Sequence, residues 1–192
     1  MTLVEVLVSM IIFSLVITVA YAALISVSRQ SADTTARSDA VDQARLGIAH
    51  MDRQIRSGDV LYDPAQEAAL GFPMSMRIYT QANAENKCVQ WQIIDGSLRM
   101  RSWSPDWPAP GSTETGWQVI ARGVINDPGN TGDIPFRLAA STSTYSPRSV
   151  DILLRVASPA ARGGEVEVRT SLTGRNTVYG YDANICDTIP PA

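Results

Sequence analysis

The first 28 residues hardly alternate between apolar and polar positions, because they form an almost continuous apolar run. Residues 6–28 include no charged residue, and the polar residues among them are Ser9, Ser14, Thr18, Ser26 and Ser28. About 20 apolar residues in a helix span the hydrocarbon core of a bilayer, so the run predicts a transmembrane helix. A signal peptide is the alternative, but no basic stretch precedes the run and no small-residue cleavage site with a change of pattern follows it.

The apolar pattern continues after Arg29 as one stripe whose members are three or four residues apart: Val41, Ala44, Ile48, Met51 and Ile55. This spacing is typical of a helix with a single buried face. No proline precedes Pro64 and Gly58 is a natural stop, so we expect one helix over about residues 1–57. Such a helix is about 80 Å long, which is much longer than a membrane crossing, so we expect only part of it to lie in a bilayer. We expect its second half to pack on a sheet rather than form a free coiled-coil seam, because strand patterns follow it.

The remainder of the chain is predicted to be rich in β-strands. Short alternating segments cover residues 74–80, 88–94, 97–103, 117–125, 134–140, 149–157 and 165–173. Asp95-Gly96 predicts a type I′ hairpin turn, and the last two segments predict a second hairpin. We therefore expect an α+β fold in which the long N-terminal helix packs on a mostly antiparallel sheet. Residues 1–28 are the apolar half of the helix, 29–57 its amphipathic half and 58–192 a β-rich head domain.

Glu5 is the anomaly in the apolar N-terminal segment. A carboxylate in an apolar zone is costly without a partner, and an ionisable residue there is a functional candidate. The α-amine of Met1 is one such partner, about one helical turn away in the same chain. In a staggered stack of helices, Glu5 of one subunit would instead lie beside the amine of the next, where pairing neutralises both charges. Glu5 and Met1 are therefore predicted to set the register of an assembly.

The segment MTLVEVLVSMIIFSL resembles the mature N-terminus of type IV pilins and of type II secretion pseudopilins. In that superfamily, a cleaved and N-methylated first residue precedes Thr-Leu, an aliphatic residue, a glutamate at position 5 and an aliphatic helix. This sequence matches the pattern at Thr2, Leu3, Val4, Glu5, Val6 and Leu7. It departs from the pattern at Met1, where phenylalanine is commonest. The short leader that ends in glycine is not in the sequence, so we expect the numbering to be that of the processed protein.

The resemblance covers roughly the first 30 residues and implies a filament subunit. It implies cleavage by a prepilin peptidase and methylation at Met1, assembly through Met1 and Glu5, and a filament core built from packed helices. The core-packing residues would be Leu3, Val4, Val6, Leu7, Ile11, Ile12 and Phe13. The partners implied are other copies of the chain, other pilins and an assembly platform. The precursor would span the cytoplasmic membrane once, and the mature chain would lie in an extracellular filament.

Three functions remain open at this stage. The first is a pilin that polymerises into a type IV pilus-like filament. The second is a low-abundance minor pilin or pseudopilin that primes or caps a pilus or a secretion pseudopilus, because the size of the head and its hairpin resemble the larger minor pilins. The third is a membrane-anchored binding ectodomain, which explains the apolar run but neither Glu5 nor the continuous helix.

Charge and cysteine content restrict the picture further. The net charge is −3 and the sequence pI about 5.1, which argues against a strongly basic nucleic-acid-binding protein. The two cysteines, Cys88 and Cys186, are far apart and have no CxxC spacing. In an exported protein such a pair predicts one disulfide, with two buried free thiols as the alternative. Closing a loop of this length stabilises a fold by roughly 4 kcal/mol in the chain-entropy model.

The sequence gives little sign of catalysis, and we expect no enzyme activity. The one histidine, His50, is expected to be a solvated helix residue, and no Cys/His cluster or Gly-rich phosphate loop is present. We expect no cofactor, with calcium as the exception to consider. Asp127, Asn130 and Asp133 lie in a Gly-containing loop that supplies oxygen ligands, although an ordinary surface turn uses the same residues. Three tryptophans either form a contact surface or cap the core: Trp103, Trp107 and Trp117.

Overall fold

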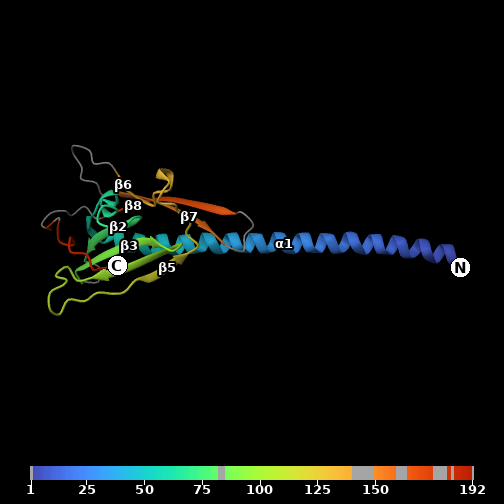
Figure 1. Cartoon of the computed structure of the whole chain (residues 1–192), viewed down its shortest axis with the longest axis horizontal. Helices are drawn as coiled ribbons and strands as arrows, with labels where there is room; N and C mark the ends of the chain where they lie inside the picture. Colours follow the sequence, from blue (N-terminus) through green and yellow to red (C-terminus); the bar gives the residue numbers. More distant parts are fainter. Residues whose placement is uncertain are drawn as a thin grey trace.

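A long helix projects from a β-rich head in the computed structural model of the chain (Figure 1). The structure describes residues 2–81, 85–139, 149–158, 164–174, 181–182 and 184–191. The N-terminus lies at the end of the helix that is remote from the head. The expected α+β fold, with a long N-terminal helix packed against antiparallel strands, is confirmed.

The helix, α1, spans Leu3–Arg56 without interruption, within a residue or two of the predicted bounds. Thr2 caps its start and Ser57 its end. Gly58 does not serve as the cap, because it already begins the first strand and pairs with Thr80. With 54 residues, α1 is about 80 Å long.

The strands form two antiparallel sheets. The five-stranded sheet has the order β1-β2-β3-β4-β5, with β1 Gly58–Leu61, β2 Ser75–Thr80, β3 Lys87–Ile94, β4 Ser97–Trp103 and β5 Gln118–Arg122. The three-stranded sheet has the order β6-β7-β8, with β6 Phe136–Leu138, β7 Ser149–Ala157 and β8 Glu165–Thr173. A short helix α2, Pro64–Glu67, follows β1, and a 3₁₀ turn η2, Thr131–Asp133, precedes β6.

Both predicted hairpins are present. Asp95 and Gly96 join β3 to β4 with φ values of 48° and 66°, the two positive values that a type I′ turn requires. In the second hairpin Val150 lies opposite Leu172 and Val156 opposite Val166, so the apolar positions of β7 and β8 share one face. The segment after β5 joins the two sheets, because Val124 forms a bridge with Val156.

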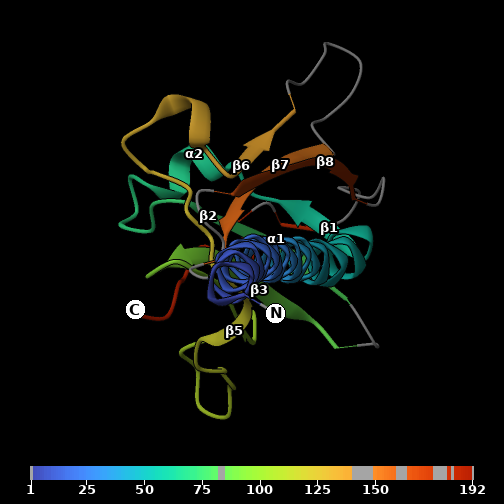
Figure 2. The ribbon, with the colours of Figure 1, turned by 90° about the vertical axis from the view of Figure 1, so that its right-hand side faces the viewer.

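The C-terminal half of α1 lies between the two sheets (Figure 2). It contacts β5 of the larger sheet and β7 and β8 of the smaller one, and the shared core includes Trp91, Phe136 and Leu154. The predicted stripe is only partly correct, because Val41 and Ile48 lie at its margin and are only half-buried. The fully buried positions of α1 are Ala36, Ala40, Ala44, Gly47, Met51 and Ile55.

Small side chains at the centre of this stripe allow the helix to approach the strands closely. A Cβ atom on Gly47 would lie 3.0 Å from Leu98 and 3.4 Å from Ala121. Contacts at this separation leave no room for a larger side chain, so the helix axis lies near both sheets. The predicted stripe was chosen by the hydrophobicity of its residues. It therefore missed Ala36, Ala40 and Gly47, which are buried because their small size allows the strands to approach the helix.

Candidate functional site

The N-terminal half of α1 is left uncovered by the described part of the chain. None of its most apolar 18-residue stretch is buried, and by length and composition it is able to cross a membrane. Leu3 is 78% exposed and Phe13 is 66% exposed. The other residues predicted to pack in a filament core are also exposed in the single chain: Val4, Val6, Leu7, Ile11 and Ile12. We call residues 3–32 the bare segment.

The bare segment extends beyond the predicted membrane-length run. Where α1 enters the head, a groove of about 990 Å³ lies along the helix, and its lining includes Ala23, Val27, Ala32 and Ala36 together with Ser158 beyond the end of β7. This lining is mostly small and apolar. The unpartnered surface therefore reaches the base of the head and does not end with the run at residue 28.

Glu5 and Thr2 form a reciprocal cap at the start of α1. The backbone N–H of Glu5 donates to the Thr2 hydroxyl, and the N–H of Thr2 donates to the Glu5 carboxylate, both at 3.4 Å. This role was not predicted, although Thr2-x-x-Glu5 has the spacing of a capping box. Glu5 is exposed and forms no ion pair with any residue in the described part of the chain. Met1, its predicted partner, lies outside the described residues.

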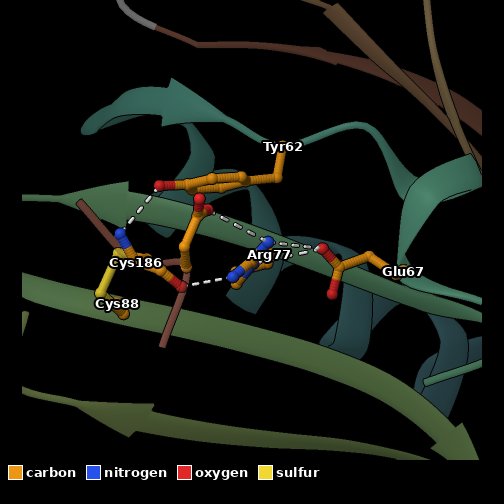
Figure 3. The surroundings of a disulfide bond; sticks show 6 residues. Tyr62, Glu67, Arg77, Cys88 and Cys186 are labelled. Atoms are coloured by element: carbon orange, nitrogen blue, oxygen red, sulfur yellow. Dashed lines mark hydrogen bonds and ion pairs between the residues drawn. A yellow bond between two sulfur atoms is a disulfide. The ribbon is translucent and has the colours of Figure 1, made fainter. Parts of the chain in front are cut away.

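The predicted disulfide between Cys88 and Cys186 is present (Figure 3). Cys88 lies in β3, Cys186 lies in the C-terminal tail, and their Cα atoms are 5.7 Å apart. Both are buried in a second apolar cluster together with Val60, Tyr79 and Trp103. The bond therefore holds the tail, residues 184–191, against the larger sheet.

Trp103 belongs to that cluster and is buried, while Trp107 packs against the same cluster from outside. Trp117 lies against the guanidinium of Arg101, with the cation 4.5 Å from the ring centroid. Two of the three tryptophans thus cap apolar packing, and the third covers a buried cation. The second of the two expected roles, capping the core, is therefore met by Trp103 and Trp107 but not by Trp117.

A row of buried polar side chains crosses the larger sheet, and the sequence analysis did not identify it. Arg77, Gln90 and Arg101 lie opposite one another on β2, β3 and β4. Gln90 donates to Ser75 at 2.9 Å, and Arg101 donates through Nε to Gln90 at 2.9 Å. All are nearly inaccessible to solvent, because α2 and the tail cover this face. Met76 and Ile78 of β2 face the core, so alternation predicts that Arg77 between them faces solvent. The sequence pattern therefore gave no sign that this face is buried.

Glu67 of α2 completes the row. Its carboxylate pairs with the Arg77 guanidinium at 3.1 Å and accepts a longer bond from Gln90. Burial raises the pKa of Glu67, while the charge of Arg77 and its hydrogen bond oppose the rise. Burial also lowers the pKa of Arg101, which forms no ion pair with any described carboxylate. A buried polar network stabilises a fold only if its donors and acceptors have hydrogen-bond partners.

The predicted calcium loop uses its oxygens within the protein. Asp127 accepts from the Gly129 N–H at 2.8 Å, and Asn130 accepts from the Gly132 N–H at 2.9 Å. Asp133 is 5% exposed and pairs with Arg155 of β7. Within the described ranges no three His, Cys, Asp or Glu side chains gather where they could hold a metal ion. Calcium binding here stays a prediction.

His50 is half-buried on α1 rather than solvated, and its Nδ1 has no hydrogen-bond partner among the described residues. The neighbouring residues that the structure describes supply no nucleophile hydrogen-bonded to it. Catalysis by a nucleophile and its base requires such a pair.

No protein-family model matches the chain, and a search of curated proteins finds no match either. The resemblance to a family therefore depends on residues 2–7 and on the apolar helix that follows them.

Proposed function

We propose that this chain is a structural pilin subunit that polymerises into a type IV pilus-like extracellular filament through its N-terminal helix. The observation that carries the proposal is the bare segment: one uninterrupted helix buries its second half in the head and leaves its first half uncovered. Large exposed apolar side chains on a folded protein indicate a lipid or protein contact. In the proposed cycle, lipid covers the bare segment first and neighbouring subunits cover it later.

Glu5 supports assembly over simple anchoring. A membrane anchor gains nothing from a carboxylate in its apolar helix, because the charge costs several kcal/mol in hydrocarbon without a partner. Within the described part of the chain, the Glu5 carboxylate receives only the long hydrogen bond from Thr2. An α-amine of a neighbouring subunit would compensate the charge in the filament core, and only the correct stagger of two helices would bring the two groups together.

The cellular route follows from the same proposal. The precursor would span the cytoplasmic membrane once, a prepilin peptidase would cleave it, and Met1 would become methylated. An assembly platform would then move the chain into the filament, where it contacts other copies and other pilins. The acidic composition does not indicate nucleic acid as a partner.

The test is to shear filaments from cells and quantify the chain by mass spectrometry, including its N-terminal peptide. A filament in which this chain predominates and begins with methylated Met1 is the expected result. A processed chain found only in trace amounts would instead assign it to the minor pilins or pseudopilins. An unprocessed membrane monomer would overturn the proposal and favour an anchored ectodomain.

A Glu5→Ala variant tests the role of the charge. We expect the variant to insert into the membrane at normal levels and to be largely absent from sheared filaments. Ser14→Ala is the matched control, because Ser14 lies in the same segment and bonds only to the Ile11 carbonyl of its own helix. Normal incorporation of Glu5→Ala would refute the register argument.

A further inference from the structure

Two side chains hold the backbone of Cys186: Arg77, in β2, and Tyr62, just after β1 (Figure 3). The Cys186 N–H donates to the Tyr62 hydroxyl at 2.9 Å. The Cys186 carbonyl accepts from Nη1 of Arg77. Both polar groups of this peptide segment are therefore satisfied by side chains and not by a strand or helix. The disulfide is a third attachment at the same residue.

Contacts outside the tail also hold these two side chains. Glu67 accepts from Nε of Arg77 at 3.2 Å and pairs with its Nη2 at 3.1 Å, which leaves Nη1 directed at the tail. A longer ion pair, 3.9 Å, joins Nη2 to Asp187 of the tail. The Arg77 guanidinium stacks over the Tyr62 ring, 4.1 Å from the centroid, and burial raises the pKa of Tyr62, which keeps its hydroxyl neutral. Glu67, Arg77 and Tyr62 thus form a unit that presents one donor and one acceptor to the Cys186 backbone.

A second attachment lies five residues further along the tail. Nη1 of Arg101 donates to the Pro191 carbonyl at 2.8 Å. Gln90 fixes Arg101 through Nε, and aromatic rings of Phe72, Trp103 and Trp117 lie within 4.5–5.6 Å of its guanidinium carbon. Arg77 and Arg101 lie on either side of Gln90 in register. Two buried arginines therefore each bind a backbone carbonyl of the same tail.

We propose that Tyr62, Arg77 and Arg101, here called the tail clamp, bind the reduced tail and position Cys186 against Cys88 before the disulfide forms. The clamp residues are positioning residues for this oxidation. A small disulfide such as oxidised glutathione is the oxidant: a protein thiolate attacks it, one glutathione leaves, and the second protein thiolate displaces the other. Two protein thiols become one disulfide, and one oxidised glutathione becomes two reduced glutathiones that carry the two protons. The proposal does not depend on the filament role.

Prior docking matters because the two cysteines are 98 residues apart. Bringing such distant positions together in a flexible chain is entropically costly, and contacts that hold the tail in place remove that cost before exchange begins. The clamp therefore raises the effective concentration of one thiol at the other. A hydrogen bond typically contributes about 1 kcal/mol net, which corresponds to about a fivefold change in an equilibrium constant.

The first experiment measures how fast the reduced full-length chain, in detergent micelles, closes the bond between Cys88 and Cys186 after oxidised glutathione is added. Alkylation at set times and mass spectrometry separate the reduced chain, the mixed disulfide with glutathione and the closed disulfide. Tyr62→Phe removes only the acceptor hydroxyl and is expected to slow closure of the mixed disulfide about fivefold, because the tail is docked less often. Tyr21→Phe is the control, since Tyr21 is exposed on the bare segment and not in the head. Closure in Tyr62→Phe at the rate of the control would overturn the proposal.

The second experiment separates positioning from general stability by using amide hydrogen exchange. In the Cys88→Ser/Cys186→Ser variant, we expect the amide at position 186 to stay protected, because Tyr62 still accepts its hydrogen bond. Adding Tyr62→Phe should abolish that protection while the Trp91 amide in the core of β3 stays protected. An unprotected amide at position 186 in the double cysteine variant would mean that the disulfide alone holds the tail, and the proposal would fail.

Discussion

The buried and the bare parts of α1 belong to one regular helix but differ in the side chains that meet their surroundings. Where α1 enters the head, its buried face consists of small residues, Ala36, Ala40, Ala44 and Gly47, and only beyond them of Met51 and Ile55. The bare segment exposes large apolar side chains, such as Phe13 and Ile12. Composition also separates the two parts, because residues 6–28 carry no charged residue, whereas residues 29–56 are amphipathic. The small buried face allows the strands of the head to approach the helix closely.

Small residues suit a partner that is always present and already in place. The strands approach the buried part so closely that a Cβ atom on Gly47 would lie 3.0 Å from Leu98, and this packing forms as the chain folds. Large apolar side chains are accommodated by lipid as well as by protein, because lipid tails are as apolar as leucine. In a single chain these side chains only cost free energy, so their presence indicates an environment outside the monomer.

A pair of methionines on the same helix gives the sharpest test of this comparison. Met51 is fully buried and Met10 is 66% exposed. We expect Met51→Ala to lower the free energy of unfolding of the head by about 2–5 kcal/mol, because a cavity remains in the core. Met10→Ala should change it by less than about 0.5 kcal/mol. Urea unfolding of the full chain in detergent, followed by tryptophan fluorescence, measures both.

A loss of similar size in Met10→Ala would break the comparison, since the bare segment would then contribute to the stability of the head.

Gly47→Ala tests whether close approach is the reason for the small residues. On an exposed helix this change stabilises by about 1 kcal/mol. Here the new methyl group would lie 3.0 Å from the buried Leu98 side chain, so we expect a loss of about 1–3 kcal/mol. Combining it with Leu98→Val should recover part of that loss, which a double-mutant cycle detects as a coupling energy. A stabilising Gly47→Ala would show that Leu98 moves aside freely and that the approach is not tight.

Local patterns were sufficient to predict most of the fold. The bounds of α1, the Asp95-Gly96 turn and the pairing of the last two strands all follow from periodicity and turn chemistry, which act between near neighbours. The pattern did not predict β1 and α2, because each has only four residues and no measurable period. Nor did it predict two sheets, since their division depends on how β5 and β7 meet around α1.

Some candidate sites could also be predicted from the sequence, and others could not. The disulfide followed from counting cysteines, and the bare segment followed from its composition. The capping role of Glu5 could have been read from Thr2-x-x-Glu5 but was hidden by the search for a charged partner. Arg77 and Arg101 could not be placed, because their strands alternate as if that face met water. The tail that covers them is about 100 residues away in sequence, so no local signal records the contact.

The bare segment and the head also differ in how they hold a glutamate: Glu5 is exposed on the bare segment, whereas Glu67 is buried in the head. Burial raises the pKa of Glu67 above its ordinary value of 4.5. As pH rises past that value, the unfolded chain ionises first, so the head loses stability until Glu67 ionises in the folded state as well. Glu67→Gln should remove this loss and flatten the dependence above pH 4.5. Urea midpoints from pH 4 to 8 measure it, and parallel curves for the two proteins would contradict the assignment.

The smallest expected effect concerns the loop of Asp127, Asn130 and Asp133. Its oxygens already accept backbone N–H groups or pair with Arg155, so calcium would have to displace these contacts. We expect added calcium to change the melting temperature of the head by less than about 1 °C. A ligand present at 100 times its dissociation constant would stabilise by about 2.7 kcal/mol, or several degrees for a protein of this size. A rise of that size, reversed by a chelator and absent in Asp127→Asn, would show that this loop of the head binds calcium.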